Sequence, residues 1–412
     1  MPGKSLRARV SSRETTNWRL QSPSRGGNVR TVESFYRPSD GVQRIVEKSE
    51  RPSTRPGPEI ISLATGDPDF DTPAHIRQAL HDAIDSGYTH YIDGRGDPEL
   101  RAAIAAEASQ LTEKPVTDAE ICITHGGAGS LSSAILGTVN PGDRVLILEP
   151  TYSSYADLLW LIGAEPVFLK QTGDFHLDLD LIRAEAPNAR MIIICHPNNP
   201  TGVVYTRSEL DELVEIAREH DLLVMSDEAY EALVFDGVEF VSTLAIPELR
   251  DRLIYCQTFS KRFAMTGWRL GYMIAPAEII RHASTVHRTF NGSGNAAVQR
   301  AALAALTVPS DAPEKMRQEY QARREIVAEL MAGTPGAEIR EPDGSFYYFI
   351  KVTAPNAPDD LVAAALEYGV AIRAGTEYGP SGKGYFRITF ATDREQLSEG
   401  VRRLRRMIES WG

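Results

Sequence analysis

Asp227 and Lys261 are two residues of this chain that could do chemistry together. Asp227 lies in the apolar stretch "LLVMSDEA" (222–229), and Lys261 directly follows "RLIYCQTFS" (252–260). The amine of a lysine can form a Schiff base with an aldehyde, and pyridoxal phosphate is the usual aldehyde. A carboxylate beside the ring nitrogen would keep that nitrogen protonated and make the ring an electron sink. Either residue alone is normally a solvated surface group, so the hypothesis depends on their joint occurrence.

A glycine cluster, "GGAGS" (126–130), follows a predicted strand at 120–124 and opens a predicted helix. The first N–H groups of a helix are unpaired and carry partial positive charge, so they hold phosphate. Glycine lets the anion approach the backbone. The cluster lacks the G-x-G-x-x-G pattern of dinucleotide sites. Taken alone, it is equally well explained as a tight strand-to-helix turn.

Short β-branched runs alternate with helical stretches from about residue 58 onward. We predict helices at 130–139, 152–163 and 208–222, and strands at 120–124, 144–150, 165–170, 190–197, 222–229 and 252–260. This alternation is typical of the α/β class, with a mostly parallel sheet sandwiched by helices. Ligands of such sheets bind beyond the carboxyl ends of the strands. We expect "HGGAGS", "EPTY", "HPNNPTG", "SDEAY" and "TFSK", which all follow or end strands, to converge on one crevice.

The pattern changes after residue 306, where a long predicted helix (312–333) is followed by mixed strands and helices. We therefore predict a large domain at 67–305 and a smaller α+β domain built from 33–66 and 306–412. Residues 1–32 carry seven lysines and arginines against Glu14 alone. We predict a flexible basic N-terminal tail there. An organelle transit peptide would share this arginine and serine bias.

Composition excludes several classes of partner. The net charge of −12 over 412 residues argues against nucleic acid as the main partner. No apolar run approaches the roughly 20 residues that a membrane-spanning helix needs, and the N-terminus lacks the apolar middle of a secretory signal. The three cysteines, Cys122, Cys195 and Cys256, share no metal-ligand spacing. Their sparse, odd number predicts a reducing cytoplasm and no metal site.

Beyond these separate patterns, the chain resembles the class I/II aminotransferase family of fold-type-I pyridoxal-phosphate enzymes. The likeness runs from about Ile60 to the C-terminus, in the order "LATGDPDFDTP" (63–73), "YIDGRGDPELR" (91–101), "GGAGS", "EPTY", "HPNNPTG", "SDEAY", "SKRFAMTGWRLGY" and "FRITFA". The resemblance implies a homodimer that binds pyridoxal 5′-phosphate. It also implies transfer of an amino group from an L-amino acid to a 2-oxo acid.

The resemblance assigns roles to individual residues. Lys261 would be the Schiff-base lysine and would carry a proton between the substrate Cα and the cofactor C4′. Asp227 would pair with the pyridinium nitrogen, Tyr230 and Asn199 would hydrogen-bond the phenolic oxygen, and Tyr152 would stack on the ring. The remaining implied ligands are the backbone N–H groups of Gly127 and Ala128, Thr258, Ser260 and Arg269 for the phosphate, Tyr91 for the phosphate across the dimer interface, and Gly66, Asn199 and Arg387 for the substrate carboxylate.

The sequence also departs from the family pattern. Ala128 stands where aspartate-using members often have a lysine, and no second arginine obviously replaces it, which disfavours an acidic amino donor. Tyr155 stands where some members have a histidine behind the ring aspartate. The same cofactor residues would also serve β- or γ-elimination, cyclopropane formation or oxidation by O₂. A non-catalytic, aminotransferase-like regulator would need a DNA-binding helix pattern, which the tail lacks.

Overall fold

The computed structural model describes residues 36–48, 57 and 59–412. The predicted tail, residues 1–32, lies outside these described residues. Residues 36–39 contain neither helix nor strand, and every described helix and strand belongs to a second unit, residues 40–412. Within the described part of the chain, no helix has the length and apolar character needed to cross a membrane.

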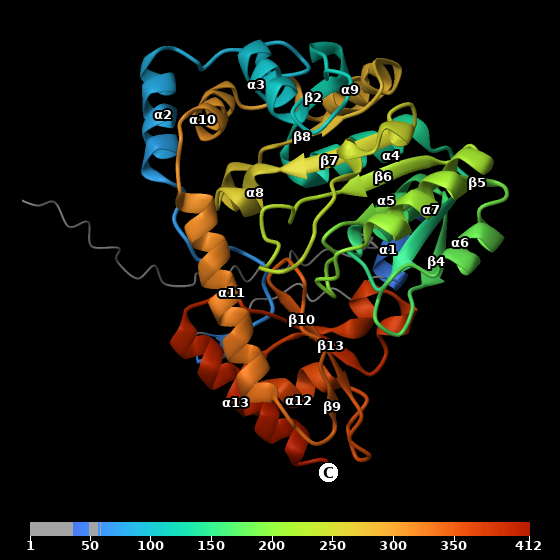
Figure 1. Ribbon diagram of the computed structural model, residues 1–412, viewed down its shortest axis with the longest axis vertical. Coiled ribbons are helices and arrows are strands. Elements are labelled where there is room, and N and C mark those ends of the chain that lie inside the picture. The colour runs from blue at the N-terminus through green and yellow to red at the C-terminus, as the bar shows by residue number, and fades with distance from the viewer. Residues whose placement is uncertain (1–35, 49–56, 58) are drawn as a thin grey trace, which may run out of the picture. The chain divides into compact units, whose positions relative to one another are not determined.

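A seven-stranded sheet forms the centre of this unit (Figure 1). Its strands, in spatial order, are β2 (Ile121–Thr124), β8 (Gly271–Ile274), β7 (Leu253–Thr258), β6 (Leu223–Asp227), β5 (Ala189–Cys195), β3 (Arg144–Glu149) and β4 (Glu165–Lys170). All neighbouring pairs are parallel except the two that involve β8. The predicted fold class, a mostly parallel sheet between helices with a smaller α+β part, is confirmed.

Strand β8 is the one strand of this sheet that the sequence patterns do not predict. It is four residues long and all four are buried. Such a short apolar run has no diagnostic periodicity, and its glycine weakens the strand signal further. It lies between β2 and β7 and runs antiparallel to both. The carboxyl ends of β2 and β7 therefore point the same way.

Helices cover both faces of the sheet because successive strand residues point to opposite sides. In β5, Ile192 and Ile194 join the core against one helical layer, whereas Met191 and Ile193 join the core against the other. The first layer consists of α2 (Ala74–Asp85), α3 (Pro98–Ala108), α6 (Leu179–Glu185), α7 (Arg207–Glu219) and α10 (Ala296–Thr307). The second consists of α4 (Gly126–Thr138), α5 (Ser154–Ile162) and α9 (Ala277–Asn291).

The ends of two helices follow from local features of the sequence. Helix α4 begins at Gly126, so the glycine cluster opens the helix, as predicted, and forms its first turn ahead of the helical stretch at 130–139. Helix α7 begins with a capping box between Thr206 and Glu209 and ends at Glu219, three residues before the predicted end. It stops there because Asp221 adopts a left-handed backbone conformation with φ of 53°.

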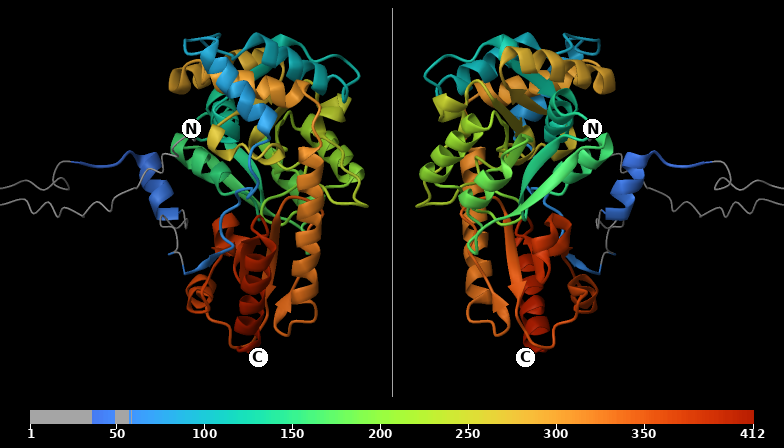
Figure 2. Two further views of the ribbon diagram at one scale, coloured as in Figure 1. Left: turned by 90° about the vertical axis from the view of Figure 1, so that its left-hand side faces the viewer. Right: turned by 90° about the vertical axis from the view of Figure 1, so that its right-hand side faces the viewer.

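A separate antiparallel sheet has the order β12 (Arg373–Ala374), β13 (Tyr385–Thr389), β10 (Tyr347–Val352) and β9 (Ala337–Glu338). A further pair joins β1 (Ile61–Ser62) to β11 (Val370–Ala371). Their core also contains α11 (Ala312–Met331), α12 (Leu361–Glu367) and α13 (Arg394–Glu409). The long α11 and the C-terminal α13 lie side by side (Figure 2, orange and dark red).

The segment before the large sheet contacts two different regions. Helix α1 (Asp40–Lys48) packs against α5, and the Lys48 ammonium lies 5.3 Å from the centre of the Trp160 ring. In contrast, β1 pairs with β11. The boundaries of the two domains, 33–66 with 306–412 and 67–305, stay predictions.

Candidate active site

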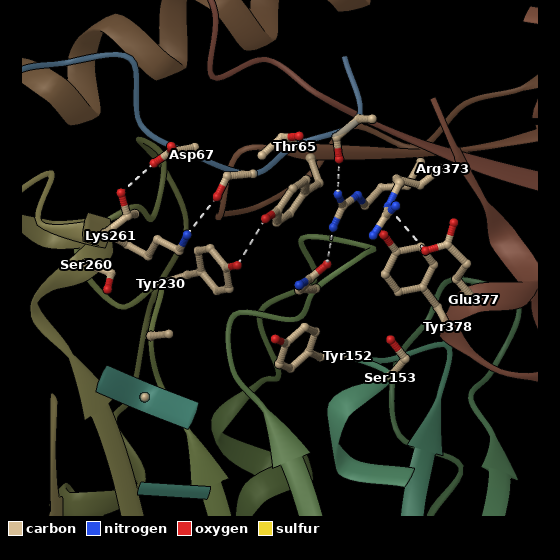
Figure 3. Close-up of a pocket in the computed structure, with 18 of the residues that line it drawn as sticks. Thr65, Asp67, Tyr152, Ser153, Tyr230, Ser260, Lys261, Arg373, Glu377 and Tyr378 are labelled. Atoms are coloured by element: carbon tan, nitrogen blue, oxygen red, sulfur yellow. Dashed lines mark hydrogen bonds and ion pairs between the residues drawn. The ribbon is translucent and has the colours of Figure 1, made fainter. Parts of the chain in front are cut away.

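A cavity of about 660 Å³ lies beyond the carboxyl ends of the parallel strands. Its walls come from the segments that follow β2, β3, β5, β6 and β7, and from the antiparallel sheet (Figure 3). Nearly all the predicted site residues line it: Gly66, Gly127, Ala128, Tyr152, Asn199, Asp227, Tyr230, Thr258, Ser260, Lys261, Arg269 and Arg387. The exception is Tyr91, whose side chain is 95% exposed. The individual roles of these residues stay predictions.

Lys261 lies on α8 (Phe259–Arg262), a single turn that directly continues β7. Thr258 caps this turn by accepting a hydrogen bond from the backbone N–H of Ser260 at 3.1 Å. The Nζ atom of Lys261 donates to the carbonyl oxygen of Gly66 at 2.7 Å. Burial lowers the pKa of Lys261 to about 8, with Asp67 acting in the opposite direction. The neutral form of this amine is therefore more populated near physiological pH than that of an ordinary lysine.

Asp227 is the last residue of β6 and is buried at the floor of the cavity. The Tyr155 hydroxyl donates to its Oδ2 at 2.7 Å, and the Ala229 N–H donates to its Oδ1 at 3.2 Å. Burial raises the pKa of Asp227, whereas these two donors and the charge of Lys261 oppose that rise. The arrangement suits a carboxylate that meets a cationic partner from the cavity side.

The beginning of α4 forms a cradle for an anion. His125 precedes the helix, and its side chain makes no capping hydrogen bond to the first N–H groups. A Cβ at Gly126 would lie 2.6 Å from Nη2 of Arg269, so only glycine admits this arginine so close. Arg269 itself has a φ of 54°, and its Nη1 donates to the carbonyl oxygen of Thr266. The Thr258 and Ser260 hydroxyls also line this region.

Arg387, on β13, lines the cavity from the antiparallel sheet. Its Nη1 donates to Oδ1 of Asn199 at 3.0 Å, and its Nη2 donates to the carbonyl oxygen of Ala64 at 2.6 Å. Its Nε is buried and has no acceptor among the described residues. The guanidinium carbon lies 4.0 Å from the centre of the Tyr347 ring and 5.1 Å from that of Tyr378. A buried, oriented guanidinium with a spare donor is suited to a carboxylate.

Several cavity residues are absent from the sequence predictions. The pairing of β12 with β13 places Arg373 directly opposite Arg387, so a second arginine does reach the cavity. Nε of Arg373 lies 3.1 Å from Oε2 of Glu377 (Figure 3). Tyr347 and Tyr378 line the same wall. The register that joins the two arginines is not visible in a single sequence. Tyr347 occurs in an ordinary apolar strand pattern, and Tyr378 ends a short 3₁₀ turn (Gly375–Tyr378).

Comparison with known proteins gives consistent matches. The family model described as "Aminotransferase class I and II" matches residues 58–404. An aspartate aminotransferase of Pyrococcus horikoshii is 33% identical over 85% of this chain and 91% of its own. The arginine–pyruvate transaminase AruH of Pseudomonas aeruginosa is 34% identical over 84% and 90%, respectively. The solved structure of an aromatic aminotransferase from P. horikoshii OT3 has a TM-score of 0.82 and 34% identity, covering 86% of this chain and 97% of its own.

Proposed function

The chain belongs to the class I and II aminotransferase family, and on that premise we propose that its cavity binds pyridoxal 5′-phosphate and that Lys261 is the central catalytic residue. The chain is an aminotransferase, which moves an amino group from an amino acid to a 2-oxo acid. The observation that carries the proposal is that a half-buried amine, Lys261, and a buried carboxylate, Asp227, line one cavity beside a helix N-terminus that has no side-chain cap.

The described residues fit the phosphate of this cofactor. The N–H groups of Gly127 and Ala128 lie in the first turn of α4, where the helix dipole favours an anion. Arg269 can add a fork of two donors, and the Ser260 hydroxyl, which accepts a hydrogen bond from Thr258 at 2.8 Å, can donate as well. A dianionic group would thus meet one full positive charge and several neutral donors.

The residues also fit the ring. Asp227 would pair with the ring nitrogen, Tyr230 and Asn199 would donate to the phenolic oxygen, and Tyr152 would cover one face. When bound, pyridoxal phosphate supplies an electron sink that stabilises negative charge at the substrate Cα. Lys261 would hold the aldehyde carbon, and its free amine would accept and return a proton at the substrate Cα. Its lowered pKa, about 8, suits that exchange.

Arg387 would bind the substrate α-carboxylate. Two of its nitrogens are already fixed by Asn199 and Ala64, so the guanidinium does not have to be ordered when substrate arrives. Gly66 would add its backbone to the same subsite, because it contacts the Lys261 amine and lacks a side chain that would fill the space.

A panel of L-amino acids tests the proposal. The protein is loaded with pyridoxal phosphate and mixed with the amino acids that its relatives are named for (aspartate, arginine and the aromatic ones) and with aliphatic ones. At least one should convert the cofactor from its aldehyde to its amine form, with one equivalent of 2-oxo acid per chain. Release of ammonia or peroxide would instead indicate elimination or oxidation. A chain that takes up no cofactor would refute the proposed cofactor.

We also propose that the protein works as a homodimer and that Tyr91 completes the phosphate site of the partner subunit. The Tyr91 ring is 95% exposed and that of Phe290, in the last turn of α9, is 69% exposed. The two segments lie together, because the N–H of Ile92 donates to the hydroxyl of Ser293 at 3.3 Å. Two exposed aromatic side chains on one surface are typical of a protein interface.

The substitution Tyr91→Phe tests this assembly. Light scattering should give a dimer for both wild type and variant, whereas the Kd for pyridoxal phosphate should rise about tenfold, because a hydrogen bond to a charged group is lost. Tyr368→Phe is the matched control, since it removes a hydroxyl that lies 3.2 Å from Ser410 outside the cavity. A monomeric protein with full activity would contradict the dimer, and an unchanged Kd would contradict the role of Tyr91.

A cytoplasmic location is part of the same proposal. All three cysteines are free and buried, and burial raises the pKa of each thiol. Buried protonated thiols without disulfides suit a reducing compartment. Recovery of the protein in the cytosolic fraction of its native cells is the expected result, and recovery in an organelle would contradict it.

A further inference from the structure

Tyr347, the first residue of β10 and one with no predicted role, lines the cavity. Its side chain is buried, and its hydroxyl lies 3.2 Å from the hydroxyl of Tyr230 (Figure 3, dashed line from Tyr230). The face of its ring lies 4.0 Å from the guanidinium carbon of Arg387. Tyr347 therefore contacts both the residue proposed to bind the substrate carboxylate and a residue proposed to bind the cofactor.

The two hydroxyls provide one spare proton. Burial raises the pKa of both Tyr230 and Tyr347, so both phenols keep their protons at neutral pH. One proton occupies the hydrogen bond between them, and the other remains free to donate elsewhere. If Tyr347 donates to Tyr230, the Tyr230 proton is available for an oxygen in the cavity. A donor that itself accepts a hydrogen bond is a stronger donor.

The ring of Tyr347 has a second, separate contact. A guanidinium stacks favourably on an aromatic face, and the attraction increases when water is excluded. Arg387 is buried, and its guanidinium carbon lies closer to the ring of Tyr347 than to the ring of Tyr378. This stacking fixes the plane of the guanidinium, while Asn199 and the Ala64 carbonyl fix two of its nitrogens.

The hydroxyl is also packed against Gly66. A Cβ at Gly66 would overlap the Tyr347 hydroxyl. The carbonyl oxygen of the same glycine accepts a hydrogen bond from the Lys261 amine. We propose that Tyr347 is a positioning residue with two separable functions: its hydroxyl orients and strengthens Tyr230 as a donor to the cofactor's phenolic oxygen, and its ring holds Arg387 in the plane that receives the substrate carboxylate. This inference rests on the proposed cofactor and deepens the account of the same site.

Two substitutions separate the two functions. Tyr347→Phe removes the hydroxyl and keeps the ring, whereas Tyr347→Leu removes both. In the loaded enzyme, a weaker Tyr230 donor stabilises negative charge on the phenolic oxygen less, so the bound chromophore keeps its proton to higher pH. The pH midpoint of the visible absorbance should therefore rise by about half a unit in both variants.

The KM values should distinguish the two variants. The KM for the amino acid should stay within about twofold of wild type in Tyr347→Phe and rise about five- to thirtyfold in Tyr347→Leu, because only leucine loses the stacked face. Tyr348→Phe is the matched control. Tyr348 is the next residue of the same strand, is equally buried, and donates its hydroxyl to the carbonyl oxygen of Arg324 at 2.9 Å, outside the cavity. It should change neither quantity.

The outcomes also separate this inference from the proposed function. A wild-type protein that binds no pyridoxal phosphate overturns the proposed function. A wild type that binds and transaminates, with an unchanged absorbance midpoint in Tyr347→Phe, overturns the role of the hydroxyl. An unchanged KM in Tyr347→Leu overturns the role of the ring. Thermal unfolding of all three variants identifies any loss of fold, and Tyr347→Phe retains the packing that leucine does not.

Discussion

Replacing Lys261 with alanine is expected to lower the rate of amino transfer by at least about 10⁴-fold, because the variant loses both the nucleophile and the general base. The fold should persist. Among the described residues, the native amine makes one hydrogen bond, to the carbonyl oxygen of Gly66, and its burial already disfavours the charged form. Removing a partly desolvated amine costs the folded state little. Single-turnover conversion of the bound cofactor by the best amino acid of the panel measures the effect.

A matched control and a rescue make this result specific. Lys170 ends β4 of the same sheet and is exposed, so Lys170→Ala should retain the wild-type rate. Small primary amines added to the Lys261→Ala variant should restore part of the rate, since they can accept the substrate Cα proton in place of the missing side chain. A variant that keeps more than a tenth of the wild-type rate, or that no amine of any basicity rescues, would show that Lys261 does not act as the base.

The pH dependence of cofactor capture follows from the same side chain. The neutral amine is the nucleophile, and Lys261 has a pKa of about 8, lowered first by burial and then by Arg387 and Arg269 against the opposing charges of Asp67 and Asp227. Below that pH, the capture rate of the cofactor-free protein should fall about tenfold per unit, and above it the rate should level off. A stopped-flow series would be inconsistent with this assignment if the rate levelled off only above pH 10.

Local patterns in the sequence predict the elements that end at the cavity. The glycine cluster, Asp227 and Lys261 each lie where an apolar run stops, and parallel strands bring such ends to one edge. Local patterns do not predict the residues that reach the cavity through pairing between strands distant in the sequence. Arg373 reaches the cavity only because β12 pairs with β13 in a register that sets it opposite Arg387. Nothing within "VAIRAG" indicates that register.

Side-chain direction on β10 illustrates the same limit. Tyr347 and Tyr348 are adjacent and chemically identical, yet one faces the cavity and the other donates to Arg324 on the far side. A strand with tyrosines at consecutive positions presents an aromatic residue to each face, so alternation cannot indicate which face holds the site. Tyr91 lies outside the cavity for a different reason. The phosphate that it is expected to contact belongs to a second subunit, so a single chain can show only that Tyr91 is exposed.

Substitution of Arg387 should affect substrate recognition more than any other change on the antiparallel sheet. Arg387→Ala is expected to lower kcat/KM for the amino acid about 10³-fold, because removing one partner of a buried charged pair typically costs 2–5 kcal/mol. The loss should be specific to the carboxylate. With the corresponding primary amine, which lacks that group, wild type and variant should react at similar low rates. Discrimination between amino acid and amine should therefore collapse in the variant, as initial rates with the paired substrates would show.

Arg373→Gln decides which of the two facing arginines binds the carboxylate. Both line the cavity, and the Nε atom of each is buried without a hydrogen-bond acceptor among the described residues. Arg373 forms an ion pair with Glu377, however, whereas the Arg387 guanidinium lies over the rings of Tyr347 and Tyr378. A cation already neutralised by a carboxylate gains less from a second one. The Arg373→Gln variant should therefore keep the preference for amino acid over amine, even if its selectivity among amino acids with different side chains changes. If that preference were lost in Arg373→Gln and kept in Arg387→Ala, the carboxylate subsite would belong to β12 and the orientation proposed for the substrate would be reversed.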